Sequence, residues 1–379
     1  MIPRPRDESD LRALLRRFPA TALLGPRQCG KTTLARAMRP DHFFDLENPR
    51  DARRLEQPQL ALEDLRGLIV IDEVQRRPEI FELLRHMIDR GRGRRFLLLG
   101  SSSAPLARAG AETLAGRIAF HHLGGLRPSD VGESRTAALW LRGGFPRSFT
   151  RRGDADSLLW RENFTATFLE RDIPQWGPRI PAPTLRRFWT MLCHAHGQVV
   201  NLSELGRSFG VSDMTVRAYL DVLSAGFMVR QLQPWHANLG KRLVRRPKIY
   251  IRDSGLLHAL LSIGARDELL SHPIAGASWE GFALESLAAE LALRPERCHF
   301  WATHNGAELD FFWQSGGRNW GAEFKLADAP AMTPSMRAAL GDLRLEHLWV
   351  IYPGRERYRL DRRVTVLPLS RLREISASL

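Results

Sequence analysis

At 379 residues, 44% of them hydrophobic, the chain exceeds one ordinary domain, and we expect two or three domains that each bury their own core. It has three cysteines without a C-x-x-C pair and no apolar run near the roughly 20 residues of a membrane span, which excludes a disulfide framework, a zinc knuckle and a transmembrane helix and favours a cytoplasmic protein. A formal net charge of +14 favours a polyanionic partner such as nucleic acid.

Up to about residue 120, short apolar runs alternate with helical patterns, as is typical of an α/β domain with a parallel sheet. The patterns predict strands at 21–24, 42–46, 68–71 and 95–99, and helices at 32–38 and 78–90. Residues 137–187 predict a helical lid and linker. Residues 184–235 predict three helices and a strand pair, and 279–369 predict helix, three strands, helix, strand. The expected domains are the α/β domain at 1–135, a helical lid at 136–183, a helix-rich domain with a strand pair at 184–252 and a mixed α/β domain at 253–379.

The segment after the first predicted strand matches the phosphate-binding pattern G-x-x-x-x-G-K-[ST] and precedes a predicted helix. In such a loop, backbone N–H groups surround the β-phosphate of ATP, Lys31 reaches the β and γ oxygens, and the Thr32 hydroxyl ligates Mg²⁺. Lysine occurs at only four positions, and arginine supplies the other 52 of the 56 basic residues, so a retained lysine marks a site that needs a compact amine. The predicted nucleotide-binding residues are Gly25, Pro26, Arg27, Gln28, Cys29, Gly30, Lys31, Thr32 and Thr33.

Two acids end the apolar run at 68–71. We expect Asp72 to hold the Mg²⁺ and Glu73 to orient the attacking water, since phosphoryl transfer needs positioning and charge neutralisation. Ser101, after the next strand, is a candidate sensor of the γ-phosphate or a plain strand terminator. Arg117 is the candidate for the extra positive charge at the transition state, often supplied by a neighbouring subunit, and Arg27 is the other possibility. Cys29 is expected to fill space, with a redox role as the alternative.

Residues 202–220 have the spacing of a helix-turn-helix, with Gly206 at the helix crossing and Gly210 in the turn. The second helix exposes Asp213, Arg217 and Asp221, only one of which is basic, so base readout by this helix is not expected. The wing is different, because basic residues crowd the segment 241–248 and can bind phosphates without reading sequence. The candidate DNA-binding residues are Arg217, Lys241, Arg242, Arg245, Arg246 and Lys248.

The C-terminal part holds a second acidic constellation. Asp310 lies on one predicted strand, and Glu323 and Lys325 share one face of the next. Two carboxylates on neighbouring strands can hold Mg²⁺ against a scissile phosphate while the lysine activates water, and Glu280 could complete the metal shell. The order of elements agrees with the PD-(D/E)XK nuclease core. The alternative is a degenerate nuclease fold that only binds.

Several segments beyond the loop recur in the same order in one family: 71–73, 100–102, 114–117, 143–146, 248–250 with Asp253, and 308–310 with 323–325. Together they resemble the prokaryotic AAA-type ATPases with a C-terminal domain of unknown function, which are similar to archaeal ATPases of the STAND group. The resemblance covers nearly the whole chain. It implies an AAA-type domain, a winged helix and a restriction-endonuclease-like domain, with ATP hydrolysis and oligomerisation.

These observations favour a homo-oligomeric ATPase that uses ATP and Mg²⁺ and binds or remodels DNA, with branched DNA as one candidate. Two alternatives remain open from the sequence. One is an ATP-dependent metal nuclease, and the other is a nucleotide-gated switch that changes its partner contacts.

Overall fold

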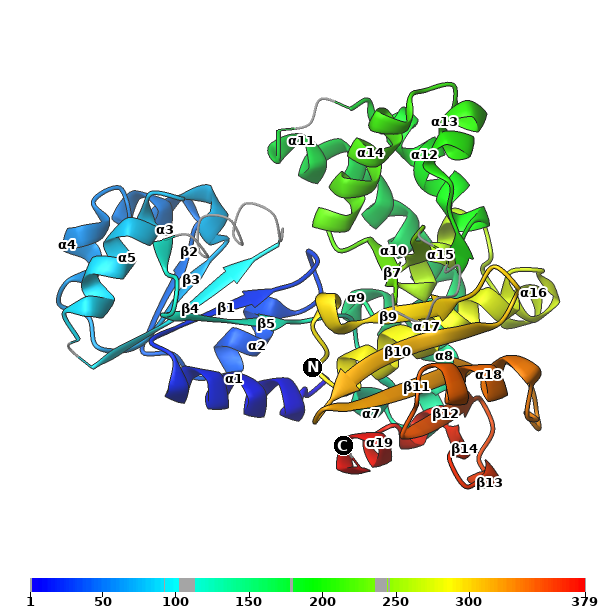
Figure 1. The fold of residues 1–379 in the computed structure, drawn as a ribbon. Helices are drawn as coiled ribbons and strands as arrows, with labels where there is room; N and C mark the ends of the chain where they lie inside the picture. Colours follow the sequence, from blue (N-terminus) through cyan, green and yellow to red (C-terminus); the bar gives the residue numbers. More distant parts are fainter. Residues whose placement is uncertain are drawn as a thin grey trace. The chain divides into compact units, whose positions relative to one another are not determined.

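The computed structural model describes residues 2–91, 93–101, 113–177, 180–235, 244 and 246–378 (Figure 1). The chain forms two compact units. The first consists of Met1–Gly125 together with Ala225–Phe227, and the second of Leu126–Ser224 together with Met228–Leu379. The predicted limits at 183 and 252 both fall inside the second unit.

The first unit contains a five-stranded parallel sheet in the order β2-β3-β4-β1-β5, which confirms the predicted α/β domain. Its strands are β1 (Ala20–Leu24), β2 (His42–Asp45), β3 (Gly67–Asp72), β4 (Arg94–Gly100) and β5 (Ile118–His122). Its helices are α1 (Pro5–Arg17), α2 (Lys31–Ala37), α3 (Pro49–Arg54), α4 (Pro58–Leu62), α5 (Ile80–Asp89) and the 3-10 turn η1 (Val74–Arg76).

Apolar side chains cover both faces of this sheet, as the continuous apolar runs of its strands require. Alternate residues of β3 and β4 enter different cores because successive side chains of a strand point to opposite faces. Ile69 and Ile71 join the core that α5 covers, whereas Val70 joins the core of α1 and α2. The strand order also inserts β4 between β1 and β3, so that the carboxyl ends of these three strands meet at one edge of the sheet.

The second unit begins with a helical region, as predicted for 137–187. Its helices are α7 (Pro128–Val131), η2 (Glu133–Arg135), α8 (Thr136–Arg142), α9 (Pro146–Phe149), α10 (Asp154–Thr167), the π turn η3 (Phe168–Asp172), α11 (Ile173–Gln175) and α12 (Ala182–His194). Two turns that are distant in the sequence meet here: Asp253 accepts a hydrogen bond from the Gly144 N–H at 2.7 Å and caps the following helix through the Leu256 N–H at 2.9 Å. The Asp253 carboxylate thus joins the start of its own helix to a turn 109 residues earlier in the chain.

The helices α13 (Leu202–Phe209) and α14 (Asp213–Ala225) follow. Gly206 is buried where the two helices meet, and a Cβ at this position would lie 2.7 Å from the Val211 carbonyl oxygen. Gly210 ends α13 with a φ of 75°, a conformation that favours glycine. Phe209 of α13 and Val216 of α14 are buried in the same core.

A nine-stranded sheet runs through the rest of the second unit in the order β13-β14-β12-β11-β10-β9-β7-β8-β6. Its strands are β6 (Gln198–Val199), β7 (Val229–Pro234), β8 (Lys248–Ile251), β9 (His299–Ala302), β10 (Glu308–Ser315), β11 (Arg318–Phe324), β12 (His347–Tyr352), β13 (Tyr358–Asp361) and β14 (Val364–Pro368). The remaining helices are α15 (Ser254–Leu260), α16 (Arg266–Ser271), α17 (Ala275–Glu290), η4 (Pro295–Arg297), α18 (Pro334–Asp342), η5 (Leu369–Arg371) and α19 (Arg373–Ser378). Because β7 pairs with β9, the two predicted C-terminal domains share one sheet.

No helix in the described ranges combines the length and the apolar character needed to cross a bilayer.

Candidate functional site

The turn between β1 and α2 depends on two glycines. A Cβ on Gly25 would lie 2.1 Å from the Leu123 carbonyl oxygen, so the main chain has no room for a side chain there. Gly30 precedes α2 with a φ of 105°, which side-chain-bearing residues rarely adopt. The turn Gly25–Gly30 is therefore built for close packing, and it opens directly into the amino end of a helix, where N–H groups are unpaired and favour an anion.

Lys31 and Thr32 begin α2 and face the same edge of the sheet. The Lys31 ammonium is buried and donates to the carbonyl oxygens of Gly25, at 3.0 Å, and Pro26, at 2.9 Å. The Thr32 hydroxyl donates to Asp72 Oδ2 at 2.7 Å. The amine thus lies inside the loop, and the two predicted magnesium ligands touch each other. Among the other predicted contacts, Gln28 and Thr33 are exposed.

Asp72 ends β3 and is buried, which raises its pKa to about 6 although the hydrogen bond from Thr32 works in the opposite direction. Glu73 follows in the left-handed region with a φ of 54°, a strained conformation for a residue with a side chain. Its carboxylate accepts hydrogen bonds from the Ser101 hydroxyl, at 2.9 Å, and from the Gln75 amide. Gln75 also donates to Ser101 at 3.2 Å, so the three side chains form a closed set.

These contacts test the fit of the site to Mg²⁺ and ATP. The chain presents a hydroxyl and a carboxylate already in contact, a buried ammonium inside the loop, and a helix amino end beside them. The residues therefore fit a magnesium-bound triphosphate, with Thr32 and Asp72 as the side chains that would hold the metal.

Arg27, the other candidate for the extra positive charge at the transition state, already has an acidic partner. Arg27 forms an ion pair with Glu47, and Glu47 also contacts Arg76 at 3.1 Å. One carboxylate thus joins an arginine of the loop to an arginine of η1.

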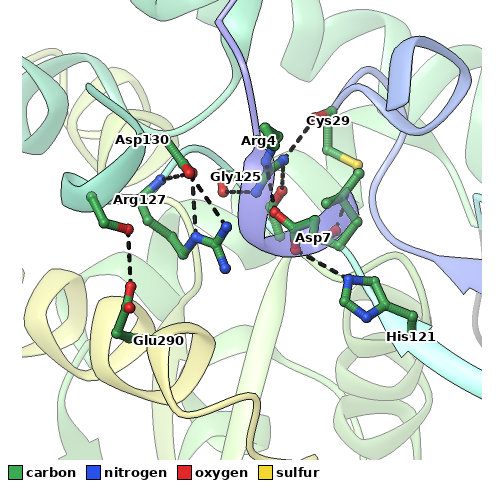
Figure 2. A network of polar contacts seen from close by, with 11 residues as sticks. Arg4, Asp7, Cys29, His121, Gly125, Arg127, Asp130 and Glu290 are labelled. Carbon is green, nitrogen blue, oxygen red and sulfur yellow. Dashed lines mark hydrogen bonds and ion pairs between the residues drawn. The ribbon is translucent and has the colours of Figure 1, made fainter. Parts of the chain in front are cut away.

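The loop is braced from α1 by a network that the sequence did not indicate (Figure 2). The Arg4 guanidinium donates to the carbonyl oxygens of Cys29 at 3.4 Å, Gly124 at 3.0 Å and Gly125 at 2.7 Å. Asp7 forms an ion pair with Arg4 at 3.1 Å and contacts His121 at 3.1 Å. Cys29 itself is buried, which raises the pKa of its thiol and favours the space-filling interpretation over the redox one.

Arg117 lies at the opposite edge of the sheet from the loop. Its carbonyl oxygen accepts from the N–H of Ala20, the first residue of β1, whereas the loop follows the last. Five residues of strand separate the two edges, or roughly 17 Å. The Arg117 side chain makes a two-pronged ion pair with Asp89, at 2.7 and 3.0 Å. It is therefore turned away from its own phosphate loop.

In the second unit the predicted acids converge with two lysines. Lys325 contacts Glu323 at 2.6 Å and Asp310 at 3.7 Å. Lys248, from β8, contacts Glu280 at 3.3 Å, Asp310 at 3.9 Å and also Glu308. Glu308 was placed on the same face of its strand as Asp310, two residues away, but was not assigned a role from the sequence, and Lys248 was not expected to pair with these acids.

Burial dominates the electrostatics of this centre. It raises the pKa of Glu280 to about 7 and that of Glu323 to about 8, and the nearby Asp310 carboxylate adds to both increases. Burial by itself lowers the pKa of Lys248, but the surrounding acids raise it on balance, so that this lysine stays charged.

The predicted second metal site does not fit this arrangement. In the described part of the chain, no three His, Cys, Asp or Glu side chains are placed so that they could hold a metal ion. The acids Glu280, Asp310 and Glu323 are instead engaged by the two ammonium groups.

The predicted DNA-binding residues have different placements. Arg217 and Arg246 are exposed, whereas Lys241, Arg242 and Arg245 lie outside the described residues. Lys248 was predicted as a phosphate contact of the wing, and this is wrong: it is only 3% exposed and points into the acidic centre. The sequence analysis also missed Gln75, which no motif marks, and Tyr250, whose hydroxyl donates to Glu280.

Comparisons with known protein families match three successive segments of the chain. Residues 17–131 match the family described as AAA domain, 134–267 match a domain of unknown function (DUF8612), and 275–372 match another (DUF4143). Among solved structures, the Walker-type ATPase PABY2304 of Pyrococcus abyssi has the same fold over 69% of this chain and 96% of that one, with a TM-score of 0.50 and 17% identity.

Two mycobacterial proteins are much closer in sequence. The uncharacterized proteins Rv2008c of Mycobacterium tuberculosis and Mb2031c of Mycobacterium bovis are each 50% identical over 376 residues, which cover 98% of this chain and 85% of theirs. The loop, the two acids that end β3 and the AAA domain match identify the first unit as an AAA-type P-loop ATPase domain. The chain therefore belongs to the family of these mycobacterial proteins, as an AAA-type P-loop ATPase that carries the two domains of unknown function behind its ATPase domain.

Proposed function

We propose that the protein is a homo-oligomeric ATPase that hydrolyses ATP and acts on DNA. The observation that carries the hydrolytic part is the contact of Thr32 with Asp72 at 2.7 Å, next to a Glu73 carboxylate held by Ser101. A Mg²⁺ bound with the nucleotide supplies positive charge to the transferred phosphoryl group. The chain's own residues bind the nucleotide, orient the attacking water and accept its proton.

Each side chain has a distinct role in this proposal. The Lys31 ammonium exchanges its two carbonyl partners for phosphate oxygens. Glu73 orients the attacking water and accepts its proton. Ser101 and Gln75 act as positioning residues that hold Glu73 in place. Ser101 thereby gains a role through Glu73 in addition to the predicted contact with the γ-phosphate.

Hydrolysis is tested with ATP and Mg²⁺ on the purified full chain. Lys31→Ala should lower kcat by about a hundredfold or more. Gln75→Ala should lower kcat while leaving KM near the wild-type value, because the Gln75 amide donates to Glu73 and Ser101 and not to residues of the phosphate loop. Turnover that survives Lys31→Ala would refute the proposed ATP site.

The oligomeric part rests on Arg117. Since its own loop lies at the other edge of the sheet, Arg117 can complete only the site of a neighbouring subunit. We expect Arg117→Ala to lower kcat strongly. Asp89→Asn is the matched control, because it removes the ion pair and keeps the arginine, and it should leave turnover near the wild-type rate.

A mixing experiment separates action within a subunit from action between subunits. Lys31→Ala and Arg117→Ala chains each lack one component, so neither is active alone. Equal amounts mixed under exchange conditions should recover about a quarter of the wild-type rate, because that fraction of interfaces joins an intact loop to an intact arginine. No recovery would remove Arg117 from the proposal and leave the ATPase itself untouched.

DNA as the partner is supported by the net charge of +14 and by the basic segment that ends at the exposed Arg246. The exposed face of α14 does not contribute, since Asp213 and Asp221 flank Arg217.

We also assign α12 to α14 with β7 and β8 as a winged helix, the elements α17 to β12 as a nuclease-like fold used for binding, and 136–183 as the lid of the ATPase.

The DNA assignment predicts hydrolysis that duplex or branched DNA stimulates, with an affinity that falls by about 0.9 log units per log unit of salt for each phosphate contact. Replacing Lys241, Arg242, Arg245 and Arg246 together by alanine should remove the stimulation and flatten the salt dependence. Arg217→Ala is the control and should change little. Stimulation that is absent in the wild type, or that survives the fourfold replacement, would refute the assignment.

A further inference from the structure

The acidic centre of the second unit contains a buried cation supplied by the chain itself. We propose that the Lys248 ammonium occupies the place in which a nuclease-like centre holds a divalent metal, so that the native centre is closed to Mg²⁺ and does not cleave DNA. The proposal rests on the nuclease-like fold proposed above for the second unit and is independent of the ATPase site.

The position of Lys248 carries this inference. Its Nζ atom lies 3.3 Å from Glu280 Oε1 and 3.9 Å from Asp310 Oδ1, and it contacts Glu308 as well. The side chain is 4% exposed. One ammonium therefore collects carboxylates from α17 and β10, and these include two of the three acids that the sequence predicts as metal ligands.

These acids have further partners. Asp310 Oδ2 accepts from the Phe324 N–H at 3.0 Å, and Glu323 Oε2 lies 2.6 Å from Lys325 Nζ. The Tyr250 hydroxyl donates to the same Glu280 oxygen that Lys248 contacts. A divalent ion needs several oxygens pointing at one place, and here each carboxylate is already paired with a cation or a hydrogen-bond donor.

Charge adds to this steric argument. A divalent ion beside Asp310 would lie within a few ångströms of a buried ammonium, and like charges in a poorly solvated region repel strongly. Metal entry therefore requires the displacement of Lys248. Because Lys248 belongs to β8 and its partners belong to α17 and β10, the same contacts tie the β7–β8 pair to the C-terminal strands.

The direct test measures Mn²⁺ binding to the full chain without nucleotide, by electron paramagnetic resonance. In the wild type we expect no Mn²⁺ binding that depends on Asp310, so that Asp310→Asn leaves the Mn²⁺ signal unchanged. Lys248→Ala and the longer, uncharged Lys248→Met should each gain a Mn²⁺ site that is at least about tenfold tighter than any Mn²⁺ binding of the wild type. The gain should disappear when Asp310→Asn is added. Arg246→Ala is the control, since it removes an exposed cation from the same segment and should create no site.

Two results would overturn the proposal. The first is Mn²⁺ binding to the wild type that Asp310→Asn abolishes, or plasmid cleavage by the wild type in Mg²⁺ or Mn²⁺ that the same substitution abolishes. The second is a folded Lys248→Ala or Lys248→Met chain, judged by tryptophan fluorescence, that gains no site. Should both lysine variants fail to fold, the wild type and Asp310→Asn decide alone, and Mn²⁺ binding and cleavage that are absent from the wild type support the proposal.

Discussion

Two histidines in the second unit are buried and neutral, and each has a hydrogen-bonding pattern that only one tautomer satisfies. His196 Nδ1 accepts from the Ile251 N–H at 3.0 Å, and its Nε2 donates to the Ala277 carbonyl oxygen at 3.1 Å. His258 lies between the Leu141 carbonyl oxygen and the Ser278 hydroxyl. A second proton on His196 Nδ1 would face an N–H donor, so protonation breaks a buried hydrogen bond.

The magnitude follows from the pKa values. Burial lowers the pKa of His196 to about 4 and that of His258 to about 3. An unfolded histidine has a pKa near 6.5, so below this pH the unfolded chain takes up protons that the folded chain refuses. Stability from these groups is therefore full at pH 8 and falls as the pH drops below about 6.5. At pH 5 each histidine lowers the free energy of unfolding by about 2 kcal/mol.

Tryptophan fluorescence isolates the relevant unit, because all ten tryptophans lie in the second unit. Urea unfolding is measured at pH 8 and pH 5 for the wild type and His196→Asn, whose amide keeps an acceptor for Ile251 and does not titrate. On going from pH 8 to pH 5, the variant should lose about 2 kcal/mol less of its free energy of unfolding than the wild type does. Glu280 and Glu323, whose pKa values are raised, make the folded chain more stable as the pH falls, which opposes the effect of the histidines. Their contribution is the same in the wild type and the variant, so it cancels in the comparison. Equal changes in both proteins would refute the reasoning.

Three further predictions concern other sites. Gly25→Ala should abolish binding of a fluorescent ATP analogue, because its Cβ would meet the Leu123 carbonyl oxygen, whereas Gly124→Ala, with open space around its Cβ, should bind as the wild type does. Cys29 in the folded chain should react with iodoacetamide far more slowly than a free thiol at pH 7.5, since burial raises its pKa, and rapid labelling read by mass spectrometry would contradict this. Glu285 of α17 forms ion pairs with Arg230 and Arg252, and although burial by itself raises its pKa, these arginines hold it near 2. Glu285→Gln should therefore lower the free energy of unfolding by about 3 kcal/mol at pH 7 and by less as the pH falls below about 4.5. An equal loss at pH 3 would count against the ion pairs.

Much of the ATPase domain was predictable from the sequence because its signals are local. The phosphate loop places all its functional atoms within nine consecutive residues, and a strand before it and a helix after it complete the pattern. The acids Asp72 and Glu73 were found for the same reason, since a buried strand leads directly into them. The helix-turn-helix glycines, Gly206 and Gly210, follow from spacing along two adjacent helices.

Arg4 and Lys248, which were missed or misplaced from the sequence, make their contacts across long stretches of chain. Arg4 reaches carbonyl groups 120 and 121 residues away, and Lys248 meets Glu280 32 residues along the chain. An arginine or lysine in a charged segment looks the same in the sequence whether it is solvated or buried. Strand order and packing decide this difference.

The amino-acid sequence by itself determined the phosphate loop, the acids that end β3 and the order of the elements, because neighbouring residues fix backbone conformation and the periodicity of apolar side chains. The tertiary structure alone decided which charges meet: it turned Arg117 away from its own loop, held Glu73 with Ser101, and brought Lys248 among the C-terminal acids. The physical reason is that the energy of a charge depends on its burial and on its neighbours in space, and neither is set by its neighbours along the chain.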